Sequence, residues 1–237
     1  MRMVAHSLDS MTSDRKGLLL LISLLVLLSS GCGTRQVVVE GRFPSPLMEP
    51  LPITLGVVYS DEFANHEFYD EAVGRNESDW LVRTGDAQVA FWNTLLGGMF
   101  ERVVIIKDHD TLHAIDEPID AVLIPYVEDL QYTIPLHTNI KVYEIWMRYR
   151  FRLVDVASIH DHDNGDISYY PTESFADFQL SAYGKTPTAF LQSDEEAVNL
   201  AAVVALRDAG AHFATAFERV PEVAAWLQTV EDKNRDQ

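Results

Sequence analysis

The chain has 237 residues, a formal net charge of −18 and one cysteine. A surface this acidic repels nucleic acid and anionic lipid headgroups, so the composition excludes attachment to either through a general basic patch. No intramolecular disulfide can form with a single cysteine, and the hydrophobic core must therefore stabilise the fold by itself.

The first 31 residues have the organisation of a secretory signal peptide. Arg15 and Lys16 precede an apolar run from Leu18 to Leu28, and small residues then lead to Cys32. A run of 11 residues is too short for a membrane-spanning helix, which needs about 20. The long segment before the run leaves the start site open between Met1, Met3 and Met11.

Cys32 directly follows Gly31, and this arrangement resembles the lipobox of bacterial lipoproteins. In that motif the signal is cut before a cysteine that carries lipid on its sulfur; Ser29 departs from the usual Leu. Two or more acyl chains, palmitate among them, would anchor the protein stably. Loss of residues 1–31 leaves 15 basic and 34 acidic residues, a formal charge of −19. The alternatives are an ordinary signal with an incidental cysteine, or a buried thiol.

The rest of the chain predicts one domain on a tether. Residues 32–52 hold the lipidated cysteine and four prolines, which predict an irregular, Pro-rich tether that keeps the domain off the bilayer. Beyond the tether we expect a single domain over 53–230 and a frayed tail over 231–237.

The first half of the domain predicts a strand, a helix and two further strands. Residues 53–59 predict a strand, 84–100 a helix with one apolar stripe, and 103–107 a short strand. The helix has Thr84 or Asp86 as its cap. Another strand is expected over 120–133, with a shared face of Val122, Ile124, Tyr126, Leu130 and Tyr132. Residues 60–82 show no clear pattern.

The longest alternating pattern of the chain runs from Val142 to Val156. It predicts a long strand with one apolar face and one wetter face, which needs a partner on each side. The apolar face holds Tyr143, Ile145, Met147, Tyr149, Phe151 and Leu153. The other face holds Glu144, Trp146, Arg148, Arg150 and Arg152.

A hairpin is expected to close at Asn164-Gly165, the residue pair typical of a type I′ turn. With that turn as the loop, Phe151 faces Phe178 and Arg152 faces Asp177, so the apolar and the charged faces match together. Ser193 caps a helix to about residue 219, Pro221 ends it, and a final short helix covers 221–229. We expect both main helices on the same face of the sheet.

Two histidine-bearing segments are candidates for a metal site. They contain Asp108, His109, Asp110 and His113 in one, and His160, Asp161, His162 and Asp163 in the other. Solvated turns have the same composition, and a calcium loop is not favoured because the glycine and the final acidic residue are out of place. We therefore expect no metal and no cofactor.

Arg148, Arg150 and Arg152 form a basic stripe in an acidic protein. The stripe could bind a carboxylate or phosphate of a ligand or partner, or pair across strands with Asp177 and with Glu128 or Asp129. The sequence has none of the motifs typical of serine hydrolases, zinc proteases, P-loop enzymes or dinucleotide-binding enzymes, so no catalytic residue is expected.

The lipobox-like start, the strand LPITLGVVYSDEF, the segment FADFQLSAYGKTPT, and the helix ALRDAGAHFATAF followed by PEVAAWL resemble uncharacterised proteobacterial envelope lipoproteins. They are more distantly similar to auxiliary lipoproteins of ABC-type transport systems. The resemblance implies a small, lipid-tethered α+β domain. The residue patterns above predict that its sheet is largely antiparallel around a long central hairpin strand, with the two main helices on one face.

The function expected from these features is non-enzymatic: binding a partner, or assisting assembly or transport of an envelope component. Gly33 after the cysteine favours the outer membrane, with the domain facing the periplasm. The alternative is a periplasmic metal-dependent enzyme that uses the histidine segments.

Overall fold

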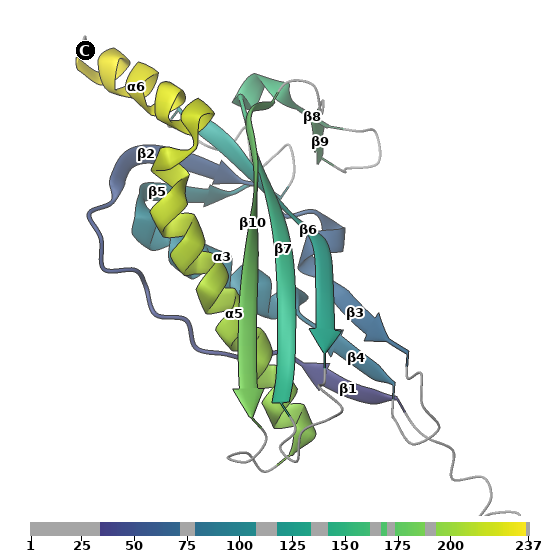
Figure 1. Cartoon of the computed structure of the whole chain (residues 1–237). Helices are drawn as coiled ribbons and strands as arrows, with labels where there is room; N and C mark the ends of the chain where they lie inside the picture. Colours follow the sequence, from purple (N-terminus) through teal and green to yellow (C-terminus); the bar gives the residue numbers. More distant parts are fainter. Residues whose placement is uncertain are drawn as a thin grey trace, which may run out of the picture.

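One long strand, β7 (Val142–Val154), lies inside the main sheet, next to its edge strand (Figure 1). The computed structural model describes residues 34–71, 79–107, 118–133, 142–161, 167–169, 174–187 and 193–235. Within these ranges the chain is an α+β protein, as the sequence predicts.

Five strands form the main sheet, in the order β10-β7-β6-β2-β5. β10 and β6 run antiparallel to β7, whereas β2 runs parallel to both β6 and β5. The bounds are Ser174–Pro187 for β10, Ala121–Thr133 for β6, Leu51–Val57 for β2 and Phe100–Ile105 for β5. The long strand therefore has hydrogen-bonded neighbours on both sides.

Two helices, α3 (Gly85–Met99) and α5 (Asp194–Ala216), cover the same face of this sheet. Trp92 of α3 packs edge-to-face against Phe151 of β7 at 4.9 Å and against Phe213 of α5 at 5.2 Å between ring centroids. All three rings are almost completely buried. These contacts confirm the predicted placement of both helices on one face of the sheet. A single layer of helices is enough to bury the apolar face of β7.

The register between β7 and β10 is also as predicted: Phe151 faces Phe178 and Arg152 faces Asp177. The tip of the hairpin differs, because a bulge between Ser174 and Ala176 shifts the pairing by one residue. Beyond a 3₁₀ turn, η1 (Val156–Ser158), the chain forms a separate two-stranded ladder of β8 (Ile159–Asp161) and β9 (Ile167–Tyr169).

The β8–β9 ladder pairs Ile159 with Tyr169, His160 with Ser168 and Asp161 with Ile167. This register is one residue away from the one that a two-residue Asn164-Gly165 turn requires. The prediction of one continuous hairpin is therefore wrong near the tip. The turn residues themselves lie outside the described ranges.

A second bulge, between Val127 and Asp129, changes which side chains of β6 face the helices. Leu130 contributes to the main core, whereas Val122 and Ile124 form a small cluster on the other face. The prediction that these residues share one face is wrong, because one extra residue reverses the alternation of a strand.

α5 lies very close to β10. A Cβ atom on Gly184 would collide with the backbone of Ala201 and Ala205. The N-terminus of α5 is capped by Ser193, whose hydroxyl accepts a hydrogen bond from the backbone N–H of Glu196 at 3.1 Å. By length and composition α5 is apolar enough to cross a membrane, but its small side chains are buried against the sheet, which explains that composition.

The segment predicted as a tether is part of the fold from Arg35 onwards. β1 (Arg35–Val38) pairs in parallel with β4 (Trp80–Arg83), and Val37 and Val39 are buried. The local sequence of β1 does not reveal this pairing, because the partner strand β4 is more than 40 residues away in the sequence.

Residues 39–50 cross over the two helices. The ring of Phe43 packs on Phe91 of α3 at 5.0 Å, and the ring atoms of Pro46 lie over Gly98. The backbone of Glu40 exchanges two hydrogen bonds with the side chain of Asn199 on α5. The structure thus differs from the expectation of a spacer at these residues, which instead form a strap across α3 and α5.

Three elements occur where the sequence shows no clear pattern: α2 (Asp61–Ala64), β3 (Glu67–Asp70) and β4. β3 runs antiparallel to β4, which makes a small sheet in the order β1-β4-β3. After α5, a short turn, η4 (Phe217–Arg219), leads into α6 (Pro221–Arg235), which extends past the predicted end at residue 229.

Candidate functional site: the outer face of the long strand

The face of the main sheet opposite the helices is called here the outer face. It carries Glu144, Trp146, Arg148, Arg150 and Arg152 of β7 with their neighbours on β6 and β10. All five side chains are exposed or half-buried, whereas the alternate residues of β7 from Tyr143 to Leu153 are buried. The alternation predicted from the sequence is therefore present.

Two of the three arginines on this face are held by carboxylates. Arg150 binds Asp177 through two hydrogen bonds of 2.7 Å, and Arg152 donates to the same carboxylate at 3.0 Å. A weaker contact of 3.5 Å joins Arg150 to Glu128. The hydrogen bond from Arg150 lowers the pKa of Asp177 below its ordinary value. The cross-strand pairing foreseen for the arginines is thus present at Arg150 and Arg152.

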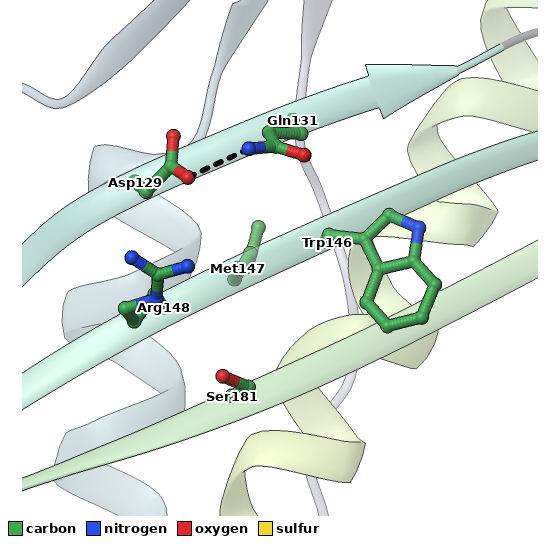
Figure 2. Close-up of a pocket in the computed structure, with 6 residues that line it drawn as sticks. All are labelled: Asp129, Gln131, Trp146, Met147, Arg148 and Ser181. Carbon is green, nitrogen blue, oxygen red and sulfur yellow. Dashed lines mark hydrogen bonds between the residues drawn. The ribbon is translucent and has the colours of Figure 1, made fainter.

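Arg148 differs from these two. It lies opposite Asp129 on β6 and Ser181 on β10. The carboxylate of Asp129 instead accepts a hydrogen bond from the amide of Gln131 at 2.9 Å (Figure 2). In the part of the chain that the structure describes, Arg148 makes no ion pair. Its guanidinium is exposed and its five N–H donors are available to a ligand.

Trp146 stands beside Arg148 on the same strand and is 48% exposed. Its ring lies 4.3 Å from the ring of Tyr183 on β10, at an angle of 40°. Burial raises the pKa of the Tyr183 hydroxyl, with a further contribution from its hydrogen bond to Glu144. Half-exposed aromatic rings of this kind are enriched at binding interfaces.

A hollow of about 100 Å³ opens between these side chains (Figure 2). Its lining comes from three neighbouring strands and comprises Asp129, Gln131, Trp146, Met147, Arg148 and Ser181. The hollow thus brings together the carboxylate of Asp129, the guanidinium of Arg148 and the ring of Trp146. The sequence pattern indicated Arg148 but not Trp146, although a tryptophan on the wetter face of an alternating strand is itself a signal.

The free edge of β10 behind the hollow is closed by side chains of α5. The backbone N–H of Tyr183 donates to Asp208 at 2.9 Å, and His212 contacts the carbonyl of Ser181 at 2.9 Å. These bonds use backbone groups that an added strand would need. This part of the β10 edge is therefore closed to strand addition, whereas the face of the sheet and its side chains stay accessible.

The histidine segments of the alternative hypothesis lie mostly outside the described ranges, including His109, His113 and His162. The backbone of His160 lies in β8. Among residues with described positions, no group of three or more His, Cys, Asp or Glu side chains is arranged to hold a metal ion. The metal hypothesis stays untested at the two histidine segments themselves.

A polar network that the sequence did not indicate runs from the surface into the core. His66 Nδ1 lies 2.7 Å from the hydroxyl of Thr84, Gln88 donates to that hydroxyl at 3.0 Å, and Tyr149 donates to Gln88 at 2.6 Å. Burial lowers the pKa of His66, against an opposing effect of Glu62 and Glu67. A histidine beside a hydroxyl can activate it as a nucleophile, but Thr84 is 0% exposed, so this hydroxyl is not accessible to a substrate.

Cys32 precedes the first described residue by two positions, so its lipid attachment stays a sequence prediction. Regular structure begins close behind this cysteine, because Arg35, three residues later, is already the first residue of β1.

No protein-family model and no curated protein matches the sequence. Similar solved structures include a Xanthomonas campestris protein of family DUF330, with 12% identity, a TM-score of 0.45, and coverage of 84% of this chain and 98% of that one. A minor lipoprotein from Acinetobacter baumannii has 10% identity, a TM-score of 0.33 and coverage of 71% and 92%.

A third similar structure is described as a neuraminyllactose-binding hemagglutinin homolog from Helicobacter pylori. It has 12% identity, a TM-score of 0.42, and coverage of 82% of this chain and 100% of that one. All three TM-scores are below 0.5, and these similarities assign no function to this chain.

Proposed function

We propose that this chain is a non-enzymatic envelope lipoprotein, anchored in the outer membrane by lipid on Cys32, which binds a protein partner through its outer face. The observation that carries the binding proposal is the pair of Trp146 and Arg148. An exposed ring and an arginine without an ion pair among the described residues stand side by side on a rigid three-stranded ladder.

The anchor proposal rests on the sequence around Cys32. The apolar run before it is too short to span a bilayer, and the mature chain is too acidic to be held by anionic headgroups. Acyl chains supply the attachment that the surface charge cannot. Gly33 after the cysteine supports the outer membrane with the domain on the periplasmic side.

The chemistry of the hollow specifies the kind of partner. A guanidinium binds carboxylates in a bidentate manner, and an adjacent indole excludes water and strengthens that bond. A partner segment that presents an acidic side chain beside an apolar or aromatic one satisfies both groups. We therefore expect an envelope protein with such a segment, which this chain holds during assembly or transport of an envelope component.

The test is co-purification from detergent-solubilised envelopes with a tagged chain and four variants. Trp146→Ala and Arg148→Gln remove the two groups of the hollow. Tyr69→Ala removes another exposed aromatic ring, 52% exposed, from a different part of the surface. Arg219→Gln removes an exposed arginine after α5. These last two serve as matched controls.

We expect one envelope protein to be lost with the two hollow variants and retained with both controls. Reconstitution of that protein with the purified chain should then show the same dependence on Trp146 and Arg148. If every variant retains the same proteins, the outer face is not the binding surface. Membrane flotation of the Cys32→Ser chain tests the anchor independently of partner binding.

A further inference from the structure

Only two residues separate the proposed anchor from the folded domain, and they limit the distance between the two. Cys32 and Arg35 are separated by Gly33 and Thr34, and three fully extended steps span at most about 11 Å. β1 begins at Arg35, and the backbone N–H of that residue already donates to the carbonyl of Asp79 at 2.8 Å. The fold therefore starts almost at the lipidated residue.

β1 is held firmly at this position. Arg35 binds Asp194 at the start of α5 at 2.9 Å, and its guanidinium lies 5.3 Å from the ring centroid of Trp80. Val37 is 4% exposed, and the strand pairs with β4 over its whole length. Moving β1 away from the domain would break these contacts, so it cannot lengthen the tether without local unfolding.

Several elements meet at this end of the molecule, which we call the anchor end and define by Arg35, Asp70, Trp80 and Asp194. Asp70 faces Trp80 across β3 and β4. The ring of Tyr143, at the start of β7, lies 6.1 Å from that of Trp80. The C-terminal helix α6 lies at the opposite end of the molecule (Figure 1).

We propose that the anchor end lies against the headgroup surface of the bilayer that carries the lipid, with α6 pointing away from it. This orientation rests on the lipid attachment proposed above. It follows from the short covalent link and from the fixed position of β1. A long, flexible tether would let the domain rotate freely relative to the membrane. The short link from Cys32 to Arg35 instead keeps the first strand close to the membrane surface.

The electrostatics of the anchor end indicate contact without insertion. Asp70, Asp79, Asp194 and Glu195 gather there, with Arg35 as the cation that binds two of them. These carboxylates repel the phosphates of lipid headgroups, so the tether and not charge attraction holds the domain at the surface.

The orientation also places the binding hollow. Trp146 is four residues from the start of β7, which corresponds to about 14 Å along the strand. Because the start of β7 lies at the anchor end, the hollow lies in the half of the long strand that is nearer the membrane. The partner must therefore present its binding segment close to the membrane.

The orientation can be measured with fluorescent labels on the complete lipoprotein in vesicles. Glu71→Cys places a label next to Asp70 at the anchor end, and Glu222→Cys places one in the first turn of α6. Both positions are exposed, and both variants lose one negative charge. Acylation blocks the sulfur of Cys32, so the parent chain takes up maleimide only if the proposed lipid is missing.

Vesicles containing lipids with a nitroxide on the headgroup then quench labels near the surface. We expect the label at residue 71 to lose most of its fluorescence and the label at residue 222 to lose little. Inserting about ten glycine and serine residues between Gly33 and Thr34 adds a flexible reach of roughly 18 Å. This insertion should restore much of the fluorescence at residue 71 while flotation stays unchanged.

Equal quenching at both positions, or stronger quenching at residue 222, would overturn the orientation while leaving the anchor intact. Labelling of the parent chain at Cys32, with loss of flotation, would instead show that the anchor itself is wrong. The two failures are therefore distinguishable.

Discussion

The hydroxyl of Tyr149 is the innermost group of the buried network. It donates to Gln88 at 2.6 Å, and both residues are 0% exposed. Burial raises the pKa of this hydroxyl, so it stays protonated as a donor. The apolar face of the long strand thus contains a fully buried hydroxyl at Tyr149, and Gln88 of α3 supplies the acceptor that its burial requires.

Replacing Tyr149 by Phe should destabilise the fold by about 1–3 kcal/mol, because the amide oxygen of Gln88 loses its donor in the core. Tyr132→Phe is the matched control. The Tyr132 hydroxyl is buried without a hydrogen-bond partner in the described part of the chain, so its removal should be neutral or stabilising. Urea unfolding of both variants gives the comparison, and equal losses would contradict it.

Asp177 predicts a pH dependence on the outer face. Its pKa is lowered in the folded state by Arg150 first and by Arg152. Stability from this group is therefore fully present above the unfolded pKa, about 3.9, and is lost as the pH falls through the lower folded value. Asp177→Asn should cost on the order of 1 kcal/mol at neutral pH.

The difference between Asp177→Asn and the parent chain should stay constant down to about pH 4 and shrink as unfolding is measured from there to about pH 2. Glu67→Gln is a suitable control, because the Glu67–Arg83 pair at 3.3 Å is about half exposed and should contribute little. A constant difference across this range would show that Asp177 does not stabilise the fold through its charge.

At the level of elements, the contact between α5 and β10 depends on small residues. Gly184 allows the backbone of the helix to approach the strand at Ala201 and Ala205. Gly184→Ala should force α5 outwards and destabilise the protein by about 1–3 kcal/mol or more. Gly97→Ala on α3 should instead stabilise it by up to about 1 kcal/mol, since nothing lies within 4 Å of the new methyl group.

Thermal unfolding of the two glycine variants, measured side by side, tests this packing. Opposite shifts of the midpoint are expected. A Gly184→Ala chain as stable as the parent would mean that α5 lies farther from β10 than the structure places it.

The elements that the sequence predicted are those whose pattern is local. The alternation over Val142–Val154 and the stripe of α3 arise from neighbouring residues, and the register with β10 came from matching Phe151 with Phe178. β1 could not be predicted in this way, because its partner β4 is remote in the sequence and each strand has four residues.

The bulges were missed for a related reason. One extra residue between Val127 and Asp129 reverses the faces of β6, and no composition signal marks it.

At the candidate site, the sequence indicated Arg148 together with Arg150 and Arg152. Only the structure separates them, because the side-chain positions show that Asp177 holds the latter two.

At the scale of the whole molecule, the features divide between two faces and two ends. The helices cover one face of the main sheet and leave the other to the hollow at Trp146 and Arg148. The chain enters the fold at the anchor end, and α6 lies at the other (Figure 1). Under the proposed function, an acidic domain so arranged depends on the lipid on Cys32 for membrane attachment and on its outer face for binding.

The central claim, a lipid-anchored envelope protein, is tested most directly by the mass of the N-terminal peptide of the chain extracted from membranes. We expect a mature chain that begins at Cys32 and carries acyl chains on that residue, with an unmodified chain after Cys32→Ser. A membrane-extracted chain that begins at another residue, or a Cys32 peptide of unmodified mass, would contradict the account.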